Sequence, residues 1–104
     1  KLLISLPGQF HPEQYHKKKE ETFVLLYGDL SLNLDGIKKD ISVGDVITIT
    51  PGVKHSFSTK NGSVVEEISS THYVDDSFYT DESISLNKDR KTIVTNWTSW
   101  DLII

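Results

Sequence analysis

Two histidines, one glutamate and one glutamine lie in two short segments and have the side chains needed to hold a metal ion. Gln14, His16 and Glu21 form the first segment, and His55 follows a Pro-Gly pair in the second. Two neutral imidazoles and a carboxylate suit non-haem iron, manganese or zinc and leave positions open for water or a substrate. The sequence therefore predicts a divalent transition-metal site (Mn, Fe, Zn or Ni), its ligands converging from one sheet face.

Gln14 is the least usual member of this set. It has the same strand parity as His16, so both side chains should point to one face. Its amide oxygen would be a fourth and weaker ligand, because a neutral amide donates less than an imidazole. The alternative is that His16 and His55 are only hydrogen-bonded residues of a metal-free pocket. His11 has the opposite parity and is expected at the surface or the pocket mouth, unless Pro12 interrupts the strand.

Several other polar residues are candidates for contact with a ligand beside the metal. Glu66 and Glu67 are adjacent, so one should face inward, where a carboxylate needs a metal, a lysine or a sugar hydroxyl as partner. The alternative is a short strand end at which both carboxylates are solvated. Within the basic run 17–19, Lys19 is expected to turn toward the pocket. His72 is expected either to line the mouth or to pack as an ordinary histidine.

Length, charge and composition exclude several classes of protein. The 104 residues suffice for one domain, and a net charge of -4 gives no electrostatic case for nucleic acid. Without cysteine there are no disulfides or thiolate metal sites. No apolar run approaches the roughly 20 residues of a membrane span, and no signal peptide is visible, so a cytoplasmic setting is expected. The chain lacks methionine and starts at Lys1, which indicates trimming or a module of a longer polypeptide.

Short strands and tight turns must position these residues. Leu30, Leu32 and Leu34 alternate with polar residues, which is the period of a half-buried strand. Asp35-Gly36 then predicts a hairpin turn with positive φ at both residues. Strands are expected over 23–27, 30–34, 37–43, 46–50, 55–59 and 64–71. Strands that recur about every ten residues between turn residues indicate a sandwich or barrel.

The pattern weakens after residue 71. The acidic and aromatic stretch 75–82 is expected to form an ordered surface loop, in which Asp76 and Tyr79 either close over the pocket or simply pack. Residues 92–104 are expected to form a final strand. Trp97 and Trp100 in that strand would be costly to leave in water, so residues 96–104 are the predicted interface of a homodimer, which would also protect strand edges.

The two segments resemble the two motifs of the cupin superfamily, and this resemblance implies an all-β, single-domain double-stranded β-helix (jelly-roll) barrel over 1–104. In the first motif His16 and Glu21 fit, whereas Gln14 stands where the first histidine is expected. Thr50 replaces the usual proline of the second motif. The positions of the second motif that fit are Gly44, Pro51, Gly52 and His55.

A narrower likeness covers almost the whole chain and concerns one cupin group. This group resembles D-lyxose ketol-isomerases and the cupin domain appended to the C-terminus of some sialic acid synthases. The shared strings are Pro7-Gly8-Gln9, His11-Pro12-Glu13, Lys19-Glu20-Glu21-Thr22-Phe23, Pro51-Gly52-Val53-Lys54-His55-Ser56-Phe57, Glu66-Glu67-Ile68-Ser69, Thr71-His72, Asp76-Ser77-Phe78-Tyr79 and Asp89-Arg90-Lys91-Thr92.

This likeness leaves two main functions open. One is an accessory module that binds a metal and a sugar or sugar acid, or helps to hold a larger enzyme together, while the reaction takes place in a barrel domain outside this chain. The other is a metal-dependent aldose–ketose isomerase, in which Glu67 or Glu66 moves the proton and Lys19 stabilises the enediolate. A non-haem iron dioxygenase and a purely structural domain are the remaining alternatives.

Overall fold

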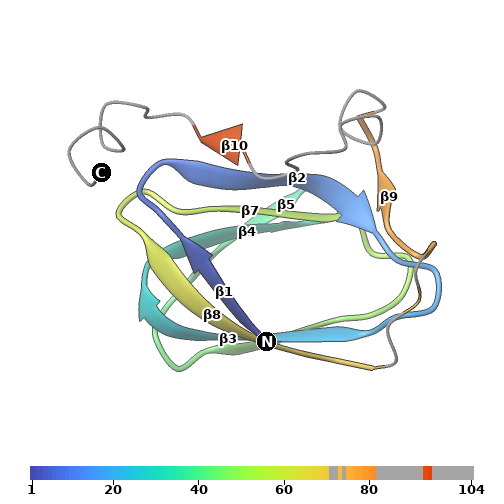
Figure 1. The fold of residues 1–104 in the computed structure, drawn as a ribbon, viewed down its shortest axis with the longest axis horizontal. Coiled ribbons are helices and arrows are strands. Elements are labelled where there is room, and N and C mark those ends of the chain that lie inside the picture. Colours follow the sequence, from blue (N-terminus) through green and yellow to red (C-terminus); the bar gives the residue numbers. More distant parts are fainter. Residues whose placement is uncertain (71–72, 74, 82–92, 95–104) are drawn as a thin grey trace.

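The computed structural model describes residues 1–70, 73, 75–81 and 93–94, which form two antiparallel β-sheets facing each other (Figure 1). One sheet has the order β1-β8-β3-β6, and the other has the order β10-β2-β7-β4-β5, with β9 also paired to β2. The all-β fold predicted from the sequence is confirmed. The strands are β1 (Leu2–Ser5), β2 (Gln9–Tyr15), β3 (Glu21–Gly28), β4 (Leu30–Leu34), β5 (Ile37–Ile41), β6 (Val46–Ile49), β7 (His55–Ser58), β8 (Ser63–Ser69), β9 (Phe78–Tyr79) and β10 (Ile93–Val94).

The core lies between the two sheets and follows from the alternation of apolar and polar residues. On β4, Leu30 and Leu32 point inward and are buried, while Ser31 between them is only half-buried. Full burial of such an apolar side chain contributes about 1.5–3 kcal/mol. Both sheets contribute to the core, whose buried members are Phe23, Leu25, Leu30, Leu32, Ile41, Ile49, Phe57 and Val65.

The turn between β4 and β5 has the predicted geometry. Asp35 and Gly36 both have positive φ, at 49° and 84°, and Leu34 pairs with Ile37 across the turn. Such a turn matches the twist of the two strands that it joins. The second strand is shorter than expected, because it ends at Ile41 rather than at residue 43.

The described residues of the segment 75–81 differ from the expected surface loop. Within 75–82, β9 pairs with β2, and the side chain of Asp76 is only 4% exposed. Ile93 and Val94 form β10 within the predicted final strand. The homodimer interface predicted at 96–104 lies outside the described residues, as does His72. Among the described residues, no helix is long and apolar enough to cross a membrane.

A paired substitution at two glycines tests how closely the strands β3 and β8 pack. Gly28 and Gly36 have similar positive φ values, 87° and 84°, but a Cβ atom at Gly28 would collide with the Gly62 carbonyl oxygen, whereas one at Gly36 meets nothing. We expect Gly36→Ala to lower the free energy of unfolding by about 1–2 kcal/mol through backbone strain. Gly28→Ala should cost a further ~1–3 kcal/mol, because backbone atoms must move. Urea denaturation measures both, and equal losses would contradict the prediction.

Candidate metal centre

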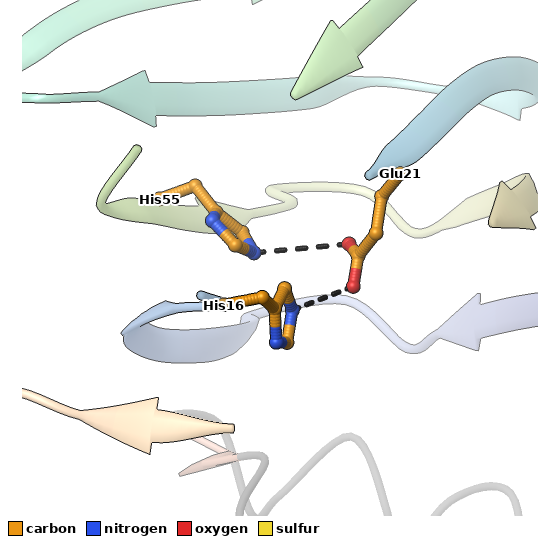
Figure 2. Close-up of side chains that lie close together, drawn as sticks. All are labelled: His16, Glu21 and His55. Carbon is orange, nitrogen blue, oxygen red and sulfur yellow. Dashed lines mark ion pairs between the residues drawn. The ribbon is translucent and has the colours of Figure 1, made fainter. Parts of the chain in front are cut away.

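Three buried side chains from both sheets meet at one end of the core (Figure 2). His16 follows β2 directly, Glu21 begins β3 and His55 begins β7. The two histidines therefore belong to the six-stranded sheet, and the glutamate belongs to the four-stranded sheet. The expectation that all three ligands come from one sheet face was wrong. The short connection 16–21 passes from one sheet to the other, so the carboxylate faces the imidazoles across the core.

The ligand atoms of these side chains lie close enough to share one ion. They all lie within 4.8 Å of one another, and the side chains are only 1–3% exposed. Nε2 of His16 lies 2.6 Å from Oε1 of Glu21, and Nε2 of His55 lies 3.7 Å from Oε2. Nε2 of His55 and Oε2 of Glu21 are buried without a hydrogen bond to any described residue, whereas Nε2 of His16 is in contact with Oε1 of Glu21. Each such atom costs about 1–3 kcal/mol, which a shared divalent cation would offset.

Hydrogen bonds at the far side of each imidazole orient Nε2 toward the centre. Nδ1 of His16 lies 2.8 Å from the carbonyl oxygen of Asp76, and Nδ1 of His55 lies 3.0 Å from that of Val53. A carbonyl oxygen only accepts, so each Nδ1 carries the proton. In the neutral ring, Nε2 then holds the lone pair that a metal requires. Both histidines are thus in the tautomer that suits a ligand.

The charges at the centre also favour a cation. Burial raises the pKa of Glu21, but contacts with His16 and with Nζ of Lys19, 2.9 Å from Oε1, outweigh it and lower the pKa to about 2. Burial lowers the pKa of His16, but Glu21 and the Asp76 carbonyl outweigh it and raise the value. For His55, burial dominates and lowers the pKa. At neutral pH, Glu21 is therefore an anion.

A cavity of about 580 Å³ adjoins the centre and contains most of the other predicted site residues. Lys19 turns inward, as expected, and Gln14 is buried in the lining of the same cavity. Of the two adjacent glutamates, Glu67 faces the cavity, whereas Glu66 is half-buried on the opposite face. Oε2 of Glu67 lies 3.3 Å from Nζ of Lys1, the kind of partner expected for an inward carboxylate. Metal ligation by Gln14 stays a prediction, as does catalysis by Glu67, Glu66 or Lys19.

His11 lines the same cavity, although its position in a regular strand predicted that its side chain would point away from the site. The pairing of β2 with β7 shifts register between His11 and Gln14, which changes the parity. The ring of His11 stacks on Phe57 at 5.1 Å and lies 6.1 Å from the ring of Tyr79. Pro12 is the signal in the sequence, because proline within a strand often marks such an irregularity.

Three solved structures illustrate the fold likeness. KdgF from Halomonas sp. has a TM-score of 0.65 and 19% identity over 71% of this chain and 68% of its own. A protein from Acidithiobacillus ferrooxidans, provisionally described as a sugar phosphate isomerase, has a TM-score of 0.61 and 22% sequence identity. The likeness covers 68% of this chain and 48% of that protein. The capsular polysaccharide assembling protein CapF from Staphylococcus aureus has a TM-score of 0.69 and 19% sequence identity. The likeness covers 75% of this chain and 26% of CapF. This chain thus spans about half or less of the last two, and these identities show the fold alone.

The sequence also matches one protein family directly. A search of curated proteins found no match. The family described as "Cupin domain" matches residues 2–68, which are more than half of the chain and include all three residues of the candidate metal centre. This match agrees with the two facing sheets and with the likeness to solved structures. The chain belongs to the cupin domain family.

Proposed function

We propose that this domain binds a divalent transition metal through Nε2 of His16, Nε2 of His55 and Oε2 of Glu21. The observation that carries the proposal is that these three buried atoms converge, and that Nε2 of His55 and Oε2 of Glu21 have no hydrogen-bond partner among the described residues. Lys19 occupies Oε1 of Glu21 and leaves Oε2 for the ion. When bound, the metal would act as a Lewis acid toward an oxygen of the ligand.

We further propose that the ligand beside the metal is a sugar or sugar acid. The cavity combines charged and amide side chains with an aromatic wall of His11, Phe57 and Tyr79. A few polar groups beside an apolar surface are typical of small-molecule sites. The two lysines and two glutamates that line the cavity balance in charge, so a bound cation would leave a positive excess. That excess favours a ligand with a carboxylate over a neutral sugar.

The proposed setting is an accessory module of a sialic acid synthase-like protein. The support for this setting is the set of shared sequence strings described above. A modular role is also consistent with CapF, of which this fold corresponds to about a quarter. In such a protein the domain would bind the ligand, and the reaction would take place elsewhere in the polypeptide.

A metal-dependent aldose–ketose isomerase is the second candidate. The observation that favours it is the inward position of Glu67 in the cavity beside the metal centre. A carboxylate there has the chemistry to carry a proton between two neighbouring carbons of an open-chain sugar. Lys19, on the same cavity wall, would stabilise the negative charge that develops on the sugar oxygens.

Metal analysis tests the ligand set directly. We expect the parent protein to take up one equivalent of manganese, iron, zinc or nickel, and a Glu21→Ala, His55→Ala double variant to take up none, because two of three ligands are lost. Glu66→Ala is the matched control, since it removes a carboxylate that points away from the cavity. Elemental analysis after equilibration and desalting gives the stoichiometry. A parent that takes up none of the four metals would overturn the proposal.

Metal uptake should release protons in a pH-dependent way. The pKa of His16 is raised above 6.5, so its ring becomes protonated as the pH falls through that raised value, whereas His55 has a lowered pKa. A metal binds only the neutral ring. We expect more protons released per metal, and weaker binding, at about pH 6 than at about pH 8. Calorimetry in buffers of different ionisation enthalpy counts these protons, and a constant count would contradict the prediction.

Paired ligands separate the two candidate functions. We expect the metal-loaded domain to bind gluconate more tightly than glucose, and to leave both unchanged, because the positive excess attracts the carboxylate.

An isomerase would instead convert an aldose such as D-lyxose or glucose to its ketose. Turnover would then fall by about 10²–10⁴-fold in Glu67→Gln and persist in the Glu66→Gln control. Calorimetry and sugar chromatography supply the two measurements, and failure to bind either ligand would overturn the sugar-acid proposal.

A further inference from the structure

Asp76 is a buried carboxylate outside the set of metal ligands, and its contacts lie on the connection between two of those ligands. Its Oδ1 accepts the backbone N–H of Lys17 at 2.9 Å, and its Oδ2 accepts that of Lys19 at 2.9 Å. The N–H of Lys18 lies 3.1 and 3.2 Å from the two oxygens. Three successive N–H groups around one anion form a nest, which holds the backbone in a single conformation.

The same residue also holds the imidazole of His16. The backbone carbonyl of Asp76 accepts the Nδ1–H at 2.8 Å, while the carboxylate holds the three residues that follow His16. Lys19, the last of these, contacts Glu21 through its side chain. Asp76 thus connects to His16 directly and to Glu21 through Lys19. One residue therefore supports both ligands that flank this connection.

The two histidines are supported in different ways. The carbonyl that holds His55 belongs to Val53, two residues earlier in the same turn, so that support is local. The carbonyl that holds His16 comes from 60 residues away, and it is in place only when the segment 75–80 lies against β2. Phe78 helps to place this segment, because its ring stacks on Tyr15 at 5.3 Å and lies 4.6 Å from Nζ of Lys17.

We propose that Asp76 is a positioning residue of the metal centre, which fixes the tautomer and orientation of His16 and the path of the backbone from His16 to Glu21. The effect on metal affinity rests on the proposed function, whereas the effect on His16 does not. Loss of a group that orients a histidine ligand typically lowers metal affinity about 10–100-fold. Asp76 is not a member of the proposed ligand set, and its role is carried by the residues that it holds.

Three variants test the metal affinity. Asp76→Ala keeps the backbone carbonyl but removes the carboxylate that ties it to residues 17–19, and should weaken metal binding about 10–100-fold because His16 is then less firmly held. Asp76→Asn keeps one oxygen acceptor and should weaken it less. Asp29→Ala is the matched control, because Asp29 also accepts two backbone N–H groups, from Lys60 and Asn61 at 2.8 and 2.9 Å, in a loop outside the metal centre. Its affinity should equal that of the parent. Parental affinity in both Asp76 variants would overturn the proposal.

The tautomer of His16 in the metal-free protein supplies a second measurement. At a pH where the His16 ring is neutral, long-range ¹H–¹⁵N NMR should show the Nδ1–H form in the parent and in Asp29→Ala, and a loss of that preference in Asp76→Ala. An unchanged tautomer would overturn the proposal. If Asp76→Ala does not fold, Asp76→Asn decides by the same criteria. If the parent binds no metal, the proposed function fails, while the tautomer still decides the role of Asp76.

Discussion

The burial of one carboxylate between two sheets is the constraint on which the rest of this structure depends. Glu21 is only 2% exposed, and an ionised group at such a position needs partners. Lys19 and His16 meet Oε1, whereas Oε2 faces His55 at 3.7 Å without a hydrogen bond. The connection that brings Lys19 inward and the turn that places His55 are both arranged around this anion. Oε2 is therefore the oxygen of Glu21 that remains available to a cation.

The cavity follows from the same geometry. Glu67 pairs with Phe23 on the inner face of the four-stranded sheet, two positions along β3 from Glu21. The candidate proton-transfer group and the carboxylate ligand therefore lie on one sheet, while the two imidazoles come from the other. A ligand bound to the metal would lie between an acidic wall with its lysine partners and the aromatic wall that includes His11. The aromatic wall would orient such a ligand, and the charged wall would interact with its polar groups. Either a binding module or an isomerase would need both.

Local pattern was sufficient to predict much of the fold and the types of ligand. The alternation of Leu30 and Leu32 with polar residues, and the pair Asp35-Gly36, are properties of adjacent residues, and the structure has the strand and the turn that they predict. The sheet to which Glu21 belongs could not be predicted, because a five-residue spacing from His16 allows either a hairpin or a crossing between sheets. The support from Asp76 was also beyond reach, because contacts between residues 60 positions apart leave no local periodicity.

The origin of the ligands in both sheets has a consequence for how the domain is held together. The chain has no cysteine, so no disulfide can join its two layers. An ion bound to His16, Glu21 and His55 would be a cross-link between the layers, closing a loop of chain much as a disulfide does. Because the unfolded chain has no preformed site, loading would stabilise the folded state by the free energy of metal binding. The centre would then be both a ligand-binding site and a metal-dependent connection between the two sheets.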